Sequence, residues 1–337
     1  MKFIRSNNIE HFVILAVYVD DVVPISDDVN ILAIEKAKLK ERFVMVDNGE
    51  IDYLLGLLIK RDRNERKLSI SQPCYLENIL ERFNMTSCNP VGTPMETGRK
   101  FSKLADNESP FTDIQLYQQA VGCLMYAATT TRPDIASAIG ILAQYMSAPS
   151  MDHWSGIKRI LRYVKGTLKY GLLFTTDDTR NHLLGYSDSD WAGDTDTRRS
   201  TSGYSFFIGR SLVSWSSRKQ ATVAKSSTEA EYVALSFATQ EAIWLRRLLT
   251  SISCSADSTT TIYEDNQGAI ELSRNPKHHN RTKHIDTSFH FTRERVMSKE
   301  VSIQYCPTSE MVADAMTKAL PRISFQKLRN YMGVVEV

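Results

Sequence analysis

The chain has 337 residues, a formal net charge of +2, and 42% hydrophobic and 24% charged residues. This balance excludes an intrinsically disordered chain and leaves room for two domains of ordinary size. Because the net charge is so small, any binding of nucleic acid has to come from local basic patches.

The five cysteines are scattered and form no CxxC pair. Their spacing argues against a disulfide framework and a cysteine-rich zinc module, and favours a reducing compartment. The longest apolar run, at 12–19, is too short to span a bilayer. No signal peptide is evident at the amino terminus. We therefore expect a soluble protein with no membrane partner.

The first half of the chain alternates strand and helix patterns and then becomes helical. Strand patterns occur at 1–5 and 11–19, and again on both sides of the turn at 63–66. The segment 84–114 carries most of the loop signals, with CNPVGTPME at its centre. Helices are predicted at 29–43, 74–85, 116–130, 135–146 and 153–167.

The second half begins with three strands close together and continues with alternating helices and strands. The strands are predicted at 183–187, 203–209, 212–217, 260–264 and 301–306. The helices are predicted at 228–249, 266–273, 285–297, 309–320 and 324–332. This order predicts an α/β sheet with helices packed on it.

Three aspartates follow the first of these strands, in LLGYSDSDWAGD at 183–194. They are Asp188, Asp190 and Asp194. Acidic turns after a strand are common and usually solvated. Taken alone, the pattern predicts a solvated turn.

The predicted helix 228–249 carries a carboxylate on its apolar side. Counting by three and four places Glu231, but not Glu229, on the apolar stripe. That stripe consists of Ala234, Leu235, Ala238, Ala242, Leu245 and Leu249. A buried carboxylate is costly unless a cation meets it. A metal ion or an arginine would do so, and the spacing does not decide between them.

Two further acids are candidates, one directly after a predicted strand and one within a predicted helix. Asp265 follows the strand 260–264, a favoured place for active-site groups in α/β folds, but aspartate is equally suited to cap the next helix. Asp314 lies beside apolar residues in the predicted helix 309–320, where it could simply pair with Lys318 one turn on.

Together, Asp188, Glu231, Asp265 and Asp314 come from two strand ends and two helices that could flank them. Converging carboxylates repel each other strongly unless cations are present. Such a cluster suits two Mg²⁺ ions about 4 Å apart, one activating water and the other stabilising the leaving oxygen of a phosphodiester. Mn²⁺ can substitute for Mg²⁺.

A series of motifs in the second half closely resembles the ribonuclease H domain of copia-type retrotransposon Pol polyproteins. In chain order they are GYSDSDWAGD, RRSTSGYSFFIG, SWSSRKQATVAKSSTEAEYVAL, EDNQGAIEL, NRTKHIDTSFHFTRE and ADAMTKAL. In the first half YVDD, CNPVGTPME, TRPDIASA and HWSGIKRILRYVKGTLKYGLLF resemble the end of the reverse transcriptase in the same polyproteins.

The resemblance implies a fold class and a division of the chain. Residues 1–175 would form the C-terminal part of a reverse transcriptase, an incomplete α+β palm and thumb with connecting helices. Residues 180–337 would form an α/β ribonuclease H-like domain, a mixed five-stranded sheet with flanking helices.

The resemblance also implies roles for individual residues. The family's metal-binding carboxylates fall on Asp188, Glu231, Asp265 and Asp314. Asp20 and Asp21 of YVDD would be two of the three palm aspartates; the third lies upstream in the family, in a region this chain lacks, so DNA synthesis by this chain alone is not expected. His284 and His290 are candidates for a histidine that helps product leave.

Basic residues offer two candidate nucleic-acid contacts. The segment 274–299 holds seven Lys/Arg residues against two acids, and Arg281 and Lys283 could contact hybrid phosphates. Lys158, Arg162 and Lys165 share one side of the predicted helix 153–167, which is either phosphate-facing or simply solvated. The histidines of 274–299 lack the partners that a zinc site needs.

We expect from the resemblance a nuclease that cuts the RNA strand of RNA–DNA hybrids. Its partners would be hybrids or other nucleic acids and other Pol segments, and its setting a cytoplasmic virus-like particle with delivery to the nucleus. The alternative is a catalytically silent, transposon-derived nucleic-acid-binding protein. An integrase-like transferase is disfavoured by the fourth carboxylate and the early three-strand meander. The sequence leaves the oligomeric state open.

Overall fold

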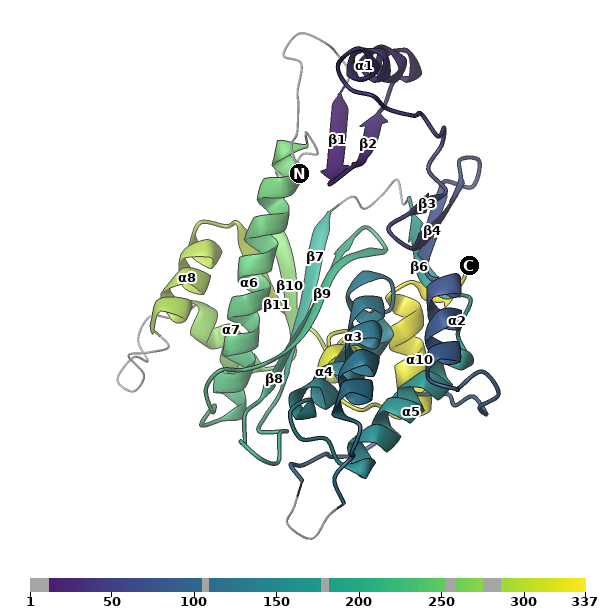
Figure 1. Cartoon of the computed structure of the whole chain (residues 1–337). Coiled ribbons are helices and arrows are strands. Elements are labelled where there is room, and N and C mark those ends of the chain that lie inside the picture. Colours follow the sequence, from purple (N-terminus) through teal and green to yellow (C-terminus); the bar gives the residue numbers. More distant parts are fainter. Residues whose placement is uncertain (1–11, 105–108, 177–181, 253–258, 275–285) are drawn as a thin grey trace.

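The computed structural model describes residues 12–104, 109–176, 182–252, 259–274 and 286–337 (Figure 1), and of 286–289 the backbone alone. Its strands form one two-stranded hairpin and two five-stranded sheets. No helix in these ranges is long and apolar enough to cross a membrane.

The hairpin stands at the amino-terminal end of the described chain, beside α1 (Figure 1). It consists of β1 (Val13–Tyr18) and β2 (Asp21–Ser26), which pair antiparallel so that Tyr18 faces Asp21. Asp28 caps α1 (Val29–Arg42) by accepting from two backbone N–H groups. The predicted helix 29–43 is thus present, but none of its residues is buried. The predicted strand 1–5 lies outside the described residues.

The antiparallel sheet joins the carboxyl-terminal strand of the chain to four strands of the first half. Its order is β12-β6-β5-β4-β3, and each strand runs antiparallel to its neighbours. The strands are β3 (Tyr53–Leu54), β4 (Leu57–Asp62), β5 (Lys67–Ser71), β6 (Tyr170–Thr175) and β12 (Val334–Glu336). Of these, β6 and β12 were not predicted from the sequence.

A helical core packs beside this sheet. It contains α2 (Pro73–Arg82), α3 (Ile114–Thr130), α4 (Ala136–Leu142), α5 (Met151–Lys165) and, from the far end of the chain, α10 (Arg322–Tyr331). Leu76, Leu124 and Ile160 are fully buried in it, and Phe325 of α10 belongs to the same cluster. Burying these side chains is the main stabilising contribution of this part of the molecule.

The mixed sheet has the order β11-β10-β7-β8-β9. Its strands are β7 (Leu183–Asp190), β8 (Thr201–Ile208), β9 (Ser211–Lys219), β10 (Thr260–Glu264) and β11 (Val301–Tyr305). The first three form an antiparallel meander, and β10 and β11 add to it in parallel. The predicted fold class, an α/β arrangement with a mixed five-stranded sheet and flanking helices, is confirmed.

Helices cover both faces of the mixed sheet. On one face lies α6 (Ser227–Ser251), whose Leu235 and Ala242 pack against Phe206, with α7 (Gln267–Arg274) and α8 (Asp286–Met297) beside it (Figure 1). On the other face the segment 311–316 packs against Phe207.

The prediction of one continuous helix over 309–320 was wrong. The chain forms a 3₁₀ turn at Thr308–Glu310 and a single helical turn, α9 (Asp314–Thr317), with extended backbone at Met311 and Lys318. Residues 311–317 are all buried, so this segment has no solvent-facing side. Packing on the sheet, not helix propensity, decides its shape.

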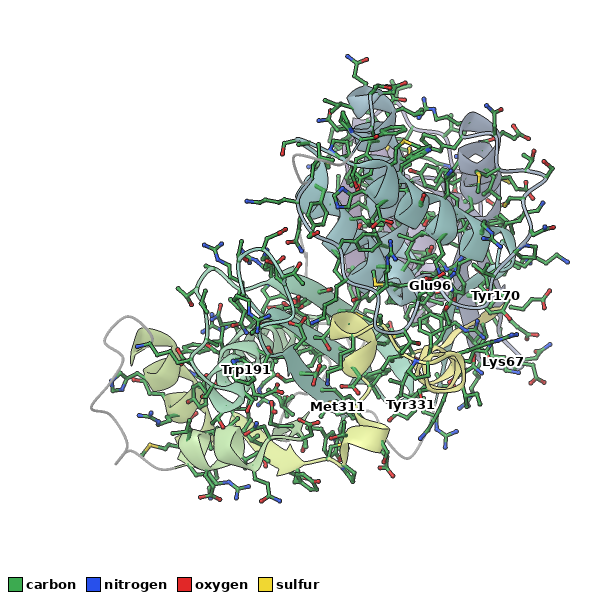
Figure 2. All side chains as sticks on the ribbon, turned by 90° about the horizontal axis from the view of Figure 1, so that it is seen from below. Lys67, Glu96, Tyr170, Trp191, Met311 and Tyr331 are labelled. Atoms are coloured by element: carbon green, nitrogen blue, oxygen red, sulfur yellow. The ribbon has the colours of Figure 1, made fainter. Side chains whose placement is uncertain are left out.

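The two sheets meet where the carboxyl-terminal segment crosses back. β12 pairs with β6, the hydroxyls of Tyr186 and Tyr331 lie 2.8 Å apart, and the Arg329 guanidinium lies over the Tyr170 ring at 4.7 Å. Figure 2 shows Tyr170 and Tyr331 at this junction. The last sixteen residues of the chain therefore hold the two halves together.

Candidate metal centre at the edge of the mixed sheet

Two parallel strands bring the first pair of carboxylates together. β10 pairs with β7 so that Tyr263 faces Tyr186, and the same register continued by two residues places Asp265 beside Asp188. Asp188 is fully buried, whereas Asp265, just beyond the strand end, is partly exposed. The edge of the sheet therefore offers one buried and one accessible carboxylate.

Glu231 reaches this pair from the first turns of α6. Carboxylate oxygens of Asp188, Glu231 and Asp265 all lie within 4.8 Å of one another. Glu231 is 7% exposed, and the apolar stripe predicted for its helix is buried against the sheet. Its Oε2 is buried and has no hydrogen-bond partner among the described residues. An unsatisfied buried carboxylate oxygen facing two other carboxylates is an arrangement that a bound cation would complete.

Asp314 joins the cluster through a lysine. The Lys318 ammonium donates to Asp314 Oδ1 at 2.7 Å and to Asp188 Oδ1 at 2.9 Å. Thr317 donates from its hydroxyl to the other oxygen of Asp188. Asp314 therefore does pair with Lys318, which was one of the two alternatives from the sequence. The same lysine also contacts Asp188 and so links Asp314 to the cluster.

Gly203 allows α9 to come this close. It faces Asp188 across the β7–β8 pair, and a Cβ at this position would lie 2.6 Å from Met316 Cβ and 2.7 Å from Thr317 Cγ2. Both distances are far below van der Waals contact, so a side chain here would push away the turn that carries Asp314. The single sequence gave no sign of this requirement.

Glu264 is a fifth acid at the cluster that sequence reasoning missed. It is fully buried, its Oε1 accepts from the Asn266 N–H at 3.2 Å, and its Oε2 has no partner among the described residues. Burial, and then the charges of Asp188 and Asp265, raise its pKa well above the usual value. Alternation along β10 places Glu264 with the buried Ile262, and this period of two was the available signal.

Two further carboxyls of the cluster, those of Glu231 and Asp314, also have raised pKa values. Burial, followed by repulsion from Asp188 and Glu264, raises the pKa of Glu231 far above its usual range. Burial and the Asp188 charge raise the pKa of Asp314 to about 7, against the opposing effect of Lys318. Burial would lower the pKa of Lys318, but the two carboxylates outweigh it and raise this pKa.

Asp265 is not the cap of α7. The side-chain oxygen of Asn266 accepts from the Ala269 N–H at 3.0 Å, so Asn266 caps that helix. Asp265 instead accepts from the Thr308 hydroxyl at 2.7 Å, and one of its oxygens belongs to the converging group. The capping alternative for Asp265 is thereby excluded.

Asp190 is the last residue of β7, whereas Asp194 lies in the loop after it, and the two have different surroundings. Asp190 accepts from the Thr201 N–H across the β7–β8 pair, and burial raises its pKa to about 7. Asp194 pairs with Lys219 at 2.6 Å and accepts from the Thr197 N–H and hydroxyl. Burial alone would raise the pKa of Asp194, but these contacts outweigh it and lower the pKa.

Asp194→Asn is expected to destabilise the protein at neutral pH by about 1–2 kcal/mol, the scale of a partly buried ion pair with local hydrogen bonds. Because the folded pKa is lowered, this stabilisation is present above the unfolded value of about 3.9 and is lost as the pH falls through the folded pKa. Urea unfolding of the two proteins at pH 4 and pH 7 should show the larger difference at pH 7.

Lys219→Gln removes the same ion pair from the other side and serves as the control for this effect. The double variant should lose less free energy than the sum of the single variants, because the two changes delete one shared interaction. Additive losses, or an Asp194→Asn effect that is larger at pH 4, would contradict the assignment.

The polymerase-like aspartates lie at the β1–β2 turn. Asp20 and Asp21 are both exposed, and Val19 beside them has a positive φ of 50°. Among the residues that the structure describes, no third acid, histidine or cysteine joins them in a metal-binding group.

The structure describes only some of the residues that the sequence suggested as nucleic-acid contacts in the basic segment. Arg281, Lys283 and His284 lie outside the described residues. His290 lies on α8 and is exposed. In the part of the chain that the structure describes, no histidine belongs to the converging group of carboxylates.

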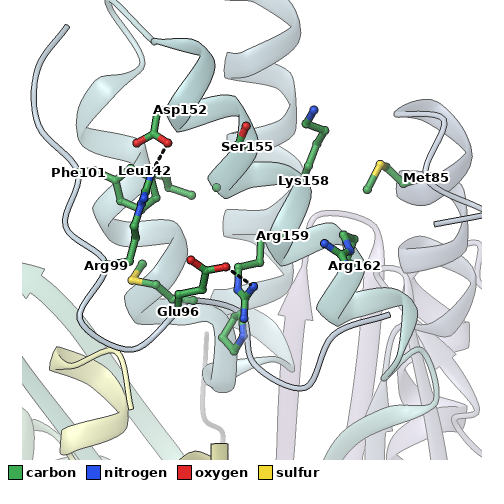
Figure 3. A pocket seen from close by; sticks show the side chains of 13 residues that line it. Met85, Glu96, Arg99, Phe101, Leu142, Asp152, Ser155, Lys158, Arg159 and Arg162 are labelled. Atoms are coloured by element: carbon green, nitrogen blue, oxygen red, sulfur yellow. Dashed lines mark hydrogen bonds and ion pairs between the residues drawn. The ribbon is translucent and has the colours of Figure 1, made fainter. Parts of the chain in front are cut away.

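Lys158 and Arg162 line a pocket of about 430 Å³ between α5 and the loop 94–101 (Figure 3). Arg99 and Arg159 line it too, each paired with an acid, Asp152 and Glu96 respectively. Arg162 donates to the Asn89 carbonyl at 2.7 Å. The pocket thus carries four cations and two carboxylates, a net positive lining.

Comparison with known proteins identifies the family of the chain. A family model described as reverse transcriptase (RNA-dependent DNA polymerase) matches residues 2–97. The Pol polyproteins of the transposons TNT 1-94 of Nicotiana tabacum and RE2 of Arabidopsis thaliana are 40% and 39% identical, each over 96% of this chain. A putative transposon Ty5-1 protein of Saccharomyces cerevisiae is 30% identical over 66% of this chain and 71% of its own length. The chain belongs to the copia-type retrotransposon Pol family.

The chain spans 24% and 22% of the lengths of the two plant Pol polyproteins. Solved structures similar to this Pol chain include LC11-RNase H1 in complex with an RNA/DNA hybrid, at 13% identity and a TM-score of 0.31, covering 40% of this chain and 93% of that protein. A foamy viral protease-reverse transcriptase in complex with an RNA/DNA hybrid covers 87% of this chain and 36% of that protein, at 12% identity and a TM-score of 0.48.

Proposed function

We propose that this Pol chain is a ribonuclease H that cuts the RNA strand of RNA–DNA hybrids with the help of divalent cations. The observation that supports the proposal is the buried convergence of Asp188, Glu231 and Asp265, with oxygens within 4.8 Å and one Glu231 oxygen unsatisfied. A structural ion pair needs only one acid, so it does not account for three acids at one point. A site that holds metal ions for phosphodiester hydrolysis does account for them.

The donor set fits Mg²⁺ or Mn²⁺. All the converging ligands are carboxylate oxygens, which these hard cations prefer, and the partly exposed Asp265 leaves an open side for substrate. Asp188, Glu231 and Asp265 would hold one ion, and Asp188 and Asp314 would flank a second. Bound there, the ions would activate water for attack on the phosphorus and stabilise the leaving oxygen.

The residues of the chain set the geometry for this reaction. The strands fix Asp188 and Asp265 side by side, and Thr317 holds Asp188 in one orientation. Glu231 and Asp188 are buried, so water has little access to their carboxylates. We propose further that contacts to 2′-hydroxyls distinguish the RNA strand, and that Lys158 and Arg162 contact phosphates.

We also propose that Asp20 and Asp21 support no DNA synthesis in this chain. Their exposed turn forms no three-ligand group among the described residues. Polymerase palms need converging carboxylates to hold their metal ions.

The test is cleavage of a hybrid whose RNA strand is end-labelled. We expect the wild-type protein to shorten the RNA strand in the presence of Mg²⁺ or Mn²⁺, the hard cations that carboxylate oxygens bind. EDTA should stop the reaction, and the same RNA alone or in duplex with RNA should stay intact. Binding of the hybrid without cleavage in either metal would favour the catalytically silent alternative and refute the nuclease.

A further inference from the structure

Lys318 is a cation fixed inside the acidic cluster. Its ammonium lies between Asp188 and Asp314, at 2.9 and 2.7 Å from their Oδ1 atoms. The two carboxylates are 0% and 10% exposed, while the lysine side chain is 35% exposed and so has a route to solvent. Hydrogen bonds between charged groups at these distances are of the strong kind.

The acidic cluster divides into two cation positions. Asp188, Glu231 and Asp265 form one compact group, whose oxygens lie within 4.8 Å of one another. Asp314 does not belong to that group, and its Oδ1 and that of Asp188 both accept from the Lys318 ammonium. Asp188 belongs to both positions, with one oxygen bound by Lys318 and the other by Thr317.

The two positions therefore differ in what a divalent ion meets. At the first, the ion meets three carboxylates and an oxygen of Glu231 that lacks a partner. At the second, it meets a positive charge that already pairs with Asp188 and Asp314. The ammonium and a divalent ion cannot occupy this second position together, because their repulsion at such short range in a partly buried site is strong.

We propose that Lys318 occupies the second cation position and that a divalent ion enters it only by displacing the ammonium. This inference rests on the proposed function, because it requires that the cluster binds metal ions. The lysine stabilises the metal-free protein by offsetting the charge of two buried carboxylates. The same contact weakens the second ion, so the centre fills in two unequal steps.

Titration of the full chain with Mn²⁺, followed by calorimetry, tests the proposal without any activity measurement. The wild-type protein should bind a first ion and then a distinctly weaker second one. Lys318→Gln should bind the second ion at least about tenfold more tightly than the wild type does. Its affinity for the first ion should change little. Lys318→Arg, which keeps the charge, should retain a weak second step.

Lys36→Gln is the matched control for these variants. Lys36 pairs with Asp47 at 3.0 Å and is 27% exposed, but it lies on α1, which carries none of the carboxylates of the cluster. Its substitution should leave both ion affinities as in the wild type. Circular dichroism of each variant checks that it is folded.

Chemical modification of the wild-type protein gives a second measurement that does not depend on a folded variant. An amine-acylating reagent should modify Lys318 several-fold faster once the second Mn²⁺ is bound, because the ammonium has left its two carboxylates, while Lys36 should react at the same rate throughout. A protein that binds no Mn²⁺ would refute the proposed function itself. Mn²⁺ binding in which Lys318→Gln leaves the second ion equally weak, or Lys318 reactivity stays constant, would overturn this inference alone.

Discussion

Asp265→Asn is expected to fold like the wild type and to cleave the RNA strand of a hybrid at least about 100-fold more slowly. Changes outside the metal ligands already cost about 10- to 100-fold in metal affinity or activity, and a ligand should cost more. Asparagine keeps an oxygen that can accept from the Thr308 hydroxyl, so the hydrogen bond between Thr308 and residue 265 is preserved. The measurement is the single-turnover cleavage rate in saturating Mg²⁺.

Glu229→Gln is the control that separates the cluster from its surroundings. Glu229 lies two residues before Glu231 on α6, but it accepts from the Lys225 N–H and does not belong to the converging group. This variant should cleave within about threefold of the wild type, the range of ordinary surface changes. Equal rates for Asp265→Asn and the wild type, or loss of cleavage in Glu229→Gln, would contradict the assignment of the site.

Asp134→Ala is expected to lower the free energy of unfolding by about 3–5 kcal/mol, because it leaves a buried arginine without its counter-charge. Arg132 and Asp134 are fully buried and joined by two hydrogen bonds of 2.9 Å. Tyr163 of α5 donates to the same carboxylate at 2.6 Å. Arg132 also donates to the carbonyl and the hydroxyl of Thr167 after α5, so the loss spreads across the helical core.

Asp152→Ala provides the matched comparison for this loss of stability. Asp152 also pairs with an arginine, Arg99, but the two side chains are 45% and 43% exposed. Its removal should cost less than about 1 kcal/mol, as for most surface ion pairs. Urea denaturation of the two variants measures the contrast, and similar losses would mean that the buried network does not stabilise the helical core.

Local patterns were enough to predict much of the fold and the members of the candidate site. Apolar periodicity marked α6 and placed Glu231 on its buried side, as the structure has it. Runs of strand-forming residues marked the five strands of the mixed sheet. Asp188 and Asp265 were singled out because they follow predicted strands, and the structure, in which β7 continues through Asp188, brings their carboxylates together.

The remaining features depend on contacts between distant parts of the chain, which periodicity does not report. Nothing near β12 indicates that it pairs with a strand more than 150 residues earlier. The shape of 309–320 is set by burial on all sides and not by its own helical pattern. Gly203 is required by a turn that follows it by more than 100 residues, and Lys318 gains its second partner, Asp188, only in the folded chain.

The carboxyl-terminal segment packs against the first half of the chain, and this packing determines whether either half could exist as a separate module. A module that moves between polyproteins as an independent piece must carry its own sheet edges and its own core. Here β12 completes a sheet whose other strands lie before residue 176, and Phe325 of α10 fills a core built from α2 to α5. The boundary that the motifs suggest along the sequence is therefore not a boundary in space. The carboxyl-terminal segment therefore contributes to the stability of both halves.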